Sequence, residues 1–172
     1  MPSNDIDDDE VGPERRNERA RKGVARDAAP TRTLVVVPWR TERPARGEGS
    51  EVTPRSLDAR VEEAVGLARA IELDVVACPA VRVAEPKPAT LLGQGKVDEL
   101  KKAIEDEKIE LVVVDHPLSP IQQRNLEKTW GAKVLDRTGL ILEIFGERAH
   151  TKEGRLQVEL AHLTYQKSRL VR

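Results

Sequence analysis

The amino-acid sequence predicts an α/β fold with a four-stranded, mostly parallel sheet flanked by helices. Short runs rich in Val, Leu and Ile recur along the chain between Gly, Pro and charged residues, as expected of strands that are buried on both faces. Segments with apolar residues at helical spacing alternate with these runs. Most of the connections are short, and such an alternation is typical of parallel strands joined by right-handed helical crossovers.

The composition indicates a folded protein in an aqueous compartment. The 172 residues are 34% charged and 38% hydrophobic, with a formal net charge of -1, which excludes a uniformly basic nucleic-acid-binding protein but allows a local basic face. No apolar run approaches the roughly 20 residues that span a bilayer, and the acidic N-terminus is unlike a secretory signal. Cys78 is the only cysteine, so a disulfide within the chain and a Cys-based metal site are excluded. We expect a cytoplasmic protein.

Three regions are expected along the chain. Residues 1–31 combine the acidic cluster "DIDDDE" with the basic cluster "RRNERARKGVAR" and have no apolar period, so they are expected to be a disordered charged tail. This tail either contacts RNA through its arginines or has no specific role. The α/β domain is expected over residues 32–137, and a helical segment over residues 138–172.

The first half of the domain contains two predicted strands. Residues 34–37 form an apolar run, and a long loop rich in Pro, Gly and charge follows. Ser56 is expected to cap the next helix, "SLDARVEEAVGLARAIEL". Its predicted buried stripe consists of Leu57, Val61, Val65, Leu67 and Ala68. The second strand is "DVVACPAVRVA", in which Pro79 predicts an edge position or an early end.

The second half contains two further strands, "IELVVVDHP" and "AKVLD". The helix before the first of them, "KVDELKKAIEDEK", repeats Val97, Leu100 and Ile104 at helical spacing. The helix between the two strands, "SPIQQRNLEKTW", has Ser119 and Gln122 at the spacing of a capping box. Gly131 is expected to end this helix.

Two helices are predicted after the fourth strand. Thr138 is expected to cap the first, while Asp136 pairs with Arg137 or with a loop amide. Apolar stripes predict the helices themselves: Leu140, Ile141, Ile144 and Phe145 in the first, and Leu156, Leu160 and Leu163, with Val158, Ala161 and Tyr165 beside them, in the second. The second helix is rich in Lys and Arg, and the sequence ends within it without a capping signal.

The stretch "TLLGQGKVDEL" matches a phosphate-binding loop only in part. A P-loop needs Gly where Thr90 stands and Ser or Thr where Val97 stands, and a dinucleotide fingerprint needs Gly in place of Asp98. Two interpretations stay open for its glycines. They expose backbone N–H groups for a weak nucleotide site, or they supply unusual backbone dihedrals where a helix begins. The residues of the weak nucleotide site would be Gly93, Gly95 and Lys96.

The remaining polar residues predict no catalytic or metal site. Asp115 and His116 end a buried strand, where α/β sheets bind ligands, but neighbouring strand residues point to opposite faces, so Asp115 is not expected to orient His116. Residues 122–125 are polar, and they form either a solvated face or a set of donors to phosphate and sugar. His150 and His162 are too far apart for a metal-binding pair at i, i+4 spacing.

Several segments, in this order and at this spacing, resemble the N-terminal part of the HflX family of ribosome-associated GTPases. They are "GQGKVDEL", "VDHPLSPIQQRNLEK", "KVLDRTGLILEIFGERAHTKEG" and "RLQVELAHLTYQKSRL". The resemblance covers residues 34–172 and is strongest from Gly93 onward. It implies an N-terminal α/β domain, the first arm of a long antiparallel helical pair, and a GTPase domain that lies beyond this sequence.

The resemblance implies a function in binding the large ribosomal subunit and its rRNA, in ribosome dissociation or rescue. The other implied partner is the chain's own GTPase domain, and no membrane span and no DNA partner are expected. GTP and Mg²⁺ are expected only with that domain, so this chain alone should have no enzymatic activity. The residues proposed for ribosome contact are Gln123, Arg124, Arg148, Lys152, Arg155, Lys167, Arg169 and Arg172, because cations spaced along helices suit phosphate contacts.

Two alternatives stay open. The chain is either an ATP- or GTP-binding α/β domain with weak NTPase activity through the loop at residues 93–96, or an inactive truncated product. In the last case the leucines of the final helix would be exposed, and such a chain would tend to dimerise or aggregate.

Overall fold

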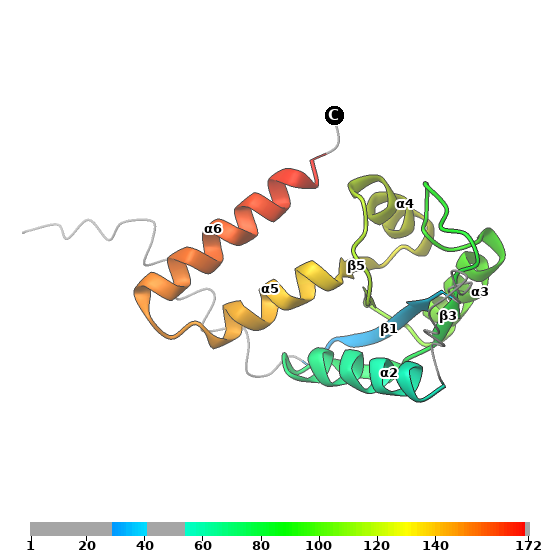
Figure 1. Cartoon of the computed structure of the whole chain (residues 1–172), viewed down its shortest axis with the longest axis horizontal. Helices are drawn as coiled ribbons and strands as arrows, with labels where there is room; N and C mark the ends of the chain where they lie inside the picture. Colours follow the sequence, from blue (N-terminus) through cyan, green and yellow to red (C-terminus); the bar gives the residue numbers. More distant parts are fainter. Residues whose placement is uncertain (1–28, 41–53, 171–172) are drawn as a thin grey trace, which may run out of the picture. The chain divides into compact units, whose positions relative to one another are not determined.

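The computed structural model describes residues 29–40 and 54–170 of the chain (Figure 1). Thr31–Arg172 forms one compact unit, and Met1–Pro30 belongs to another. Nearly all of the expected tail, and Arg172, therefore lie outside the described residues. No helix in the described ranges is long and apolar enough to cross a membrane.

The centre of the fold is a parallel sheet, as predicted. Its strands are β1 (Arg32–Trp39), β2 (Asp74–Ala77), β3 (Ala80–Arg82), β4 (Leu111–Val114) and β5 (Lys133–Asp136). The strand order is β2-β1-β4-β5, β3 also pairs with β1, and every pairing is parallel. The described residues thus form five strands where the sequence predicts four.

The extra strand arises at Pro79. The predicted second strand divides there into β2 and β3, which pair with successive parts of β1. Both alternatives considered for this proline are therefore correct, because the strand breaks at Pro79 and also lies at the edge of the sheet. The Pro79 carbonyl accepts a hydrogen bond from the Val37 N–H at 3.0 Å, so the break keeps the chain attached to β1.

Helices cover both faces of the sheet. They are α2 (Pro54–Arg69), α3 (Gln94–Asp106), α4 (Pro120–Trp130), α5 (Arg137–Arg148) and α6 (Lys152–Ser168). One hydrophobic cluster joins the sheet to α3 and α4, and a second joins its other face to α2 and α5. Successive β1 residues alternate between the clusters, with Val36 in the first and Val35 and Val37 in the second, as the pleat of a strand requires.

Most of the predicted helix signals are confirmed. Val97, Leu100 and Ile104 are the buried residues of α3. Ser119 and Gln122 form the predicted capping box of α4. Gly131 ends α4 with φ 64°, a left-handed conformation that favours glycine.

Two cap predictions are wrong. Helix α2 begins at Pro54, so Ser56 lies within its first turn instead of capping it. Asp136, not Thr138, is the N-cap of α5, and its carboxylate accepts a hydrogen bond from the Gly139 N–H at 2.9 Å. Asp136 takes the capping position because it ends β5, one residue before the helix begins. In α2, Ala68 of the predicted stripe is fully buried. Ala64 is buried as well, although the prediction omitted it.

Helix α6 lies beside α5 (Figure 1) and has no buried residues. Val158 and His162 of α6 lie nearest to Gly146 of α5, at 3.8 and 3.9 Å from the position that a Cβ there would take. Leu156 and Leu160 are mostly exposed, so the predicted leucine stripe is not the side of α6 that packs in this structure.

Candidate functional site

The loop that resembles a phosphate-binding motif begins α3. Gly93 is the N-cap of this helix, with φ -66° and ψ 149°, and Gly95 is inside it. Neither glycine has a positive φ, so the interpretation that they supply unusual dihedrals is wrong. The left-handed residue in this stretch is Leu91, with φ 66°. A Cβ on either glycine would meet nothing within 4 Å, so packing does not require them.

The lysine of this loop is already paired. The Lys96 ammonium lies 2.6 Å from the Glu99 carboxylate, and Gln94 donates a hydrogen bond to Asp98 at 2.9 Å. A phosphate bound at Gly93 and Gly95 would have to compete with Glu99 for this lysine. The weak nucleotide site therefore stays a prediction.

An ionic network around one buried carboxylate lies at the carboxyl ends of the strands. The sheet reverses its strand order between β1 and β4, the position where α/β sheets bind ligands. Asp115 follows β4, is 4% exposed, and accepts a hydrogen bond from Arg137 at 2.8 Å. Arg137 also pairs with Glu63 of α2 at 2.8 Å. Arg137 thus joins the ends of β4 and β5 to α2. Of the two alternatives for Asp136, pairing with Arg137 is therefore wrong.

Burial has the largest effect on the pKa of Asp115. Desolvation raises the pKa of this carboxyl above 3.8, and the nearby charge of Arg137 opposes that rise. Asp115 in turn raises the pKa of the Arg137 guanidinium. The Nδ1 atom of His116 lies 2.7 Å from the Pro117 carbonyl oxygen. The expectation that Asp115 does not orient His116 stays a prediction.

The polar residues of α4 hold neighbouring segments in place. Gln122 donates to the Lys87 carbonyl at 3.0 Å, and Asn125 donates to the Ala89 carbonyl at 3.0 Å. Both interactions attach α4 to the connection before α3. Arg124, between them, is exposed.

Two other α4 side chains bind the backbone of β5. Gln123 Nε2 donates to the Val134 carbonyl at 2.8 Å, and Glu127 accepts from the Val134 N–H at 3.2 Å. Gln123 and Glu127 thus occupy the C=O and N–H of Val134, which an additional strand would need in order to pair with β5. The amide nitrogen of Gln123 is therefore already engaged in the folded chain.

A buried carboxylate, Asp136, joins the end of α6 to the sheet. It is 0% exposed and accepts hydrogen bonds from Leu118 N–H at 3.1 Å and Tyr165 Oη at 2.6 Å. The Arg169 guanidinium pairs with it at 2.8 Å and also donates to the Leu118 carbonyl. Burial, followed by the hydrogen bond to Asp136, raises the pKa of Tyr165. The expected bond from Asp136 to a loop amide is confirmed at Leu118.

Gly139 makes the contact with Tyr165 possible. A Cβ at this position would stand 2.6 Å from Leu135 Cδ1 and 3.0 Å from the Tyr165 hydroxyl. Only glycine leaves room for this hydroxyl beside the first turn of α5. The sequence alone did not reveal this cluster. The sequence pattern that points to this cluster is an Asp at the end of a strand with a Gly three residues later.

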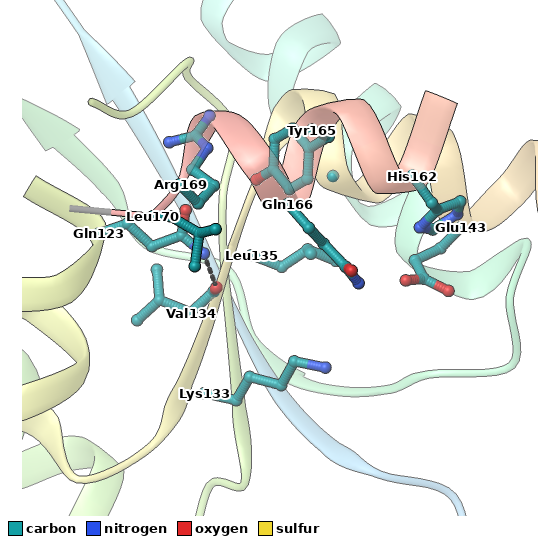
Figure 2. A pocket seen from close by; sticks show the side chains of 11 residues that line it. Gln123, Lys133, Val134, Leu135, Glu143, His162, Tyr165, Gln166, Arg169 and Leu170 are labelled. Atoms are coloured by element: carbon teal, nitrogen blue, oxygen red, sulfur yellow. Dashed lines mark hydrogen bonds between the residues drawn. The ribbon is translucent and has the colours of Figure 1, made fainter. Parts of the chain in front are cut away.

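A pocket of about 220 Å³ lies beside this cluster (Figure 2). It is bounded by β5, α4, α5 and α6, and its polar lining includes Gln123, Glu143, His162 and Arg169. Among the described residues, Gln123 Oε1 and Arg169 Nε are buried without a hydrogen-bond partner. Gln123 Oε1 is a hydrogen-bond acceptor and Arg169 Nε is a donor.

The residues proposed for ribosome contact divide into two groups. Arg155 donates from Nε to the Ala149 carbonyl at 3.3 Å, and Arg169 is held by Asp136. Among the other proposed residues, the exposed cations that form no ion pair with another described residue are Arg124, Arg148, Lys152 and Lys167. Lys152 begins α6 and Lys167 is near its end, so these cations lie toward both ends of the helix.

Comparison with known proteins identifies two adjoining matches. Residues 58–146 match the family model described as GTP-binding GTPase N-terminal, and residues 148–172 match the GTP-binding GTPase Middle Region. The first match contains the sheet from β2 onward together with most of α5, and the second contains α6.

Curated relatives of this chain are described as GTPase HflX. The chain is 52% identical over 122 residues to a GTPase HflX of Magnetococcus marinus, covering 71% of this chain and 28% of the relative. It is 44% identical over 138 residues to a GTPase HflX of Lacrimispora saccharolytica, covering 80% of this chain and 30% of the relative. The chain thus spans less than a third of these relatives.

A solved structure shares the fold. A GTP-binding protein from Sulfolobus solfataricus, solved in complex with GDP, superposes with a TM-score of 0.58 at 23% identity. The likeness covers 81% of this chain and 38% of that one. At this identity it supports the fold alone.

Proposed function

Because the chain belongs to the GTP-binding GTPase N-terminal family and forms the N-terminal region of an HflX-type GTPase, we propose that it binds the large ribosomal subunit. The proposed activity is recognition of rRNA phosphates, in support of ribosome dissociation or rescue. The chain itself performs no catalysis in this proposal. GTP and Mg²⁺ would act in a GTPase domain, which would also be its partner.

The observation that carries this proposal is the set of exposed cations at the two ends of α6. Arg148 and Lys152 flank the turn between α5 and α6, while Lys167 lies near the other end of α6. Phosphate contacts of this kind provide affinity without reading sequence. The ion pair between Arg169 and Asp136 fixes the C-terminal end of α6 to the α/β domain, so Lys167 has a defined position relative to that domain.

Co-sedimentation with isolated large subunits tests the proposal. The double substitution Lys152→Ala and Lys167→Ala should weaken binding and reduce the slope of log affinity against log salt by about one per lost contact. The matched control replaces Lys101 and Lys102 of α3, which removes the same charge elsewhere. Equal losses in both variants, or no binding of the unaltered chain at low salt, would contradict this role.

A second candidate, weak nucleotide binding at α3, is supported by the open space around Gly93 and Gly95. Backbone N–H groups at a helix N-terminus attract phosphate when a ligand can approach them. Calorimetry with ATP and with GTP tests this candidate. Lys96→Ala should abolish any heat of binding, whereas Glu99→Gln, which frees Lys96, should increase it. An absence of heat with both nucleotides would eliminate the site.

A further inference from the structure

Trp39 and Arg82 stand side by side where two neighbouring strands end. They are register partners in the parallel pairing of β1 with β3 (Figure 1). The Arg82 guanidinium lies over the Trp39 ring, 5.9 Å from its centroid. Trp is the aromatic ring that attracts a cation most strongly, so this contact holds the planar guanidinium in place. Because Arg82 is exposed, the sheet presents a flat cationic group to solvent.

The pleat of the sheet places both side chains on the α2 side. Val35 and Val37 belong to the hydrophobic cluster on that side, and Trp39 continues their alternation. On β3, Val81 belongs to the opposite cluster, so Arg82 next to it points the same way as Trp39. Trp39 also ends β1, one of the two strands at the switch point where α/β sheets bind ligands.

The pair is surrounded by further positive charge. Arg60 of α2 donates a hydrogen bond to the Pro38 carbonyl at 3.0 Å, one residue before Trp39. Arg40, one residue after Trp39, is exposed. Within the described ranges, neither of these arginines nor Arg82 forms an ion pair. We call Arg40, Arg60 and Arg82 the arginine surface.

Two carboxylates at the same edge do not neutralise the arginine surface. Glu63 and Asp115 both pair with Arg137, at 2.8 Å each. The arginine surface therefore keeps a positive charge that suits an anionic partner. An acidic peptide would use the charge alone, whereas a nucleic acid offers phosphates for the charge and bases for the flat guanidinium. The combination of arginines with a tryptophan thus favours a nucleic acid.

We propose that Arg82, supported by Trp39, stacks on an unpaired base of single-stranded RNA, while Arg40 and Arg60 bind the neighbouring phosphates. The base would lie on the face of the guanidinium away from the Trp39 ring, so that ring, guanidinium and base form one stack. Proteins hold unpaired bases on aromatic rings and on Arg guanidinium planes in this way. Stacking accepts any base, so the surface should bind RNA without reading its sequence.

The inference goes beyond the proposed function, because the arginine surface lies at the end of the sheet and contains none of the cations of α6. The two functions are also separable by experiment. The double variant Lys152→Ala and Lys167→Ala, which should bind the large subunit weakly, should keep its affinity for a short RNA strand. A loss of strand binding in that variant equal to the loss caused by changes at Arg82 would overturn the separate surface.

Fluorescence polarisation with a labelled, short uridine strand tests stacking by the 172-residue chain. The matched probe is an abasic strand of the same length, which has the same phosphates and no bases. We expect tighter binding of the uridine strand. Equal affinities for the two strands would overturn the proposal, because phosphate contacts alone would then explain the binding. Displacement of the strand by micromolar uridine monophosphate would assign the surface to free nucleotides and would also overturn it.

Arg82→Lys separates stacking from charge, because lysine keeps the charge and lacks the planar guanidinium. This variant should lose affinity for the uridine strand by about five-fold or more, as expected when one base loses its stacking partner, and should bind the abasic strand as before. The control Arg69→Lys makes the same exchange at an exposed arginine that ends α2, and it should bind both strands normally. Equal losses in the two variants would contradict the role of Arg82.

Trp39→Leu tests the support of the guanidinium. The variant keeps every arginine but removes the ring beneath Arg82, so it should weaken binding of the uridine strand as Arg82→Lys does. Circular dichroism verifies that the variant folds. Arg40→Ala should instead weaken binding of both strands equally, because it removes a phosphate contact. A folded Trp39→Leu variant that still prefers the uridine strand as strongly as the unaltered chain does would overturn the proposed stack.

Discussion

The carboxylate of Asp136 and the guanidinium of Arg169 meet at 2.8 Å although 33 residues separate them in the sequence. Asp136 ends the last strand of the sheet, and Arg169 directly follows α6. This pair therefore fixes the orientation of α6 relative to the α/β domain. Because α6 also carries the proposed ribosome contacts, the pair connects the fold to the proposed function.

Removing the Asp136 carboxylate should be strongly destabilising. Asp136→Ala leaves the Arg169 guanidinium and the donors around it without their acceptor, and breaking a buried ion pair in this way costs about 3–5 kcal/mol. Urea denaturation measures this change. The control is Glu63→Ala, which breaks an ion pair of the same length, 2.8 Å, at a carboxylate that is 53% exposed. Its expected cost is about 0–1 kcal/mol.

The Tyr165 hydroxyl should stabilise the attachment of α6. Tyr165→Phe removes its 2.6 Å hydrogen bond to a buried carboxylate, for an expected loss of about 1.5–3 kcal/mol. Hydrogen exchange should become faster in α6 while that of β4 is unchanged. Thr164→Val is the control, since it removes the exposed hydroxyl that donates to the Leu160 carbonyl. Equal acceleration in the two variants would show that Tyr165 has no special part.

Stability should depend on pH through Asp115. Its pKa is raised above 3.8 in the folded chain, so folding favours the protonated carboxyl. The corresponding stability is present below the unfolded pKa and is lost as the pH rises through the folded pKa. As the pH rises from the unfolded to the folded pKa of Asp115, the free energy of unfolding of the unaltered chain should fall relative to that of Asp115→Asn. The opposite trend would mean that the ion pair with Arg137 outweighs burial.

The Cys78 thiol should react slowly. Burial, with the Asp115 charge as the second cause, raises the pKa of Cys78 to about 11. Because the thiolate is the nucleophile, alkylation of the native chain at pH 8 should be much slower than that of a thiol in an unfolded peptide. Asp115→Asn should lower the pKa of Cys78 and accelerate its labelling. Unchanged labelling would mean that burial alone raises the pKa of Cys78.

Two left-handed residues after helices should respond oppositely to substitution. Lys108 has φ 52° and is exposed, so Lys108→Gly should stabilise the chain by about 0.5–1 kcal/mol through relief of backbone strain. Gly131 has φ 64° with open space around it, so Gly131→Ala should destabilise by about 1–2 kcal/mol through strain alone. Thermal denaturation measures both. Changes of the same sign in the two variants would contradict this explanation.

The sequence predicted features that depend on neighbouring residues. Apolar runs identified the strands, and the spacing of Ser119 and Gln122 identified the capping box of α4. Pro79 correctly indicated an edge and a break, although not the separate strand that follows it. In each of these cases, the interactions that decide the structure lie within a few residues of the chain.

The sequence did not reveal features that depend on distant contacts. Arg137 stands beside Asp136, yet it pairs with Asp115 and Glu63 because the sheet brings β4 and α2 close to its side chain. Arg169 is one of several basic residues near the end of the chain, and only the fold distinguishes it as the partner of Asp136. The leucines of α6 are exposed, which agrees with the sequence, but helical periodicity alone does not show that Val158 and His162 form the side that meets α5.

The contacts of Gln123 and Glu127 with Val134 have a consequence for the behaviour of the domain in crowded solution. The β5 edge would otherwise offer this N–H and C=O to an unfolded or neighbouring polypeptide, which is how sheets recruit foreign strands and begin to aggregate. At the opposite edge, Pro79 has no N–H to donate. The side chains of Gln123 and Glu127 at one edge and Pro79 at the other thus hinder the pairing of further strands with this Val-rich sheet, and so hinder its aggregation.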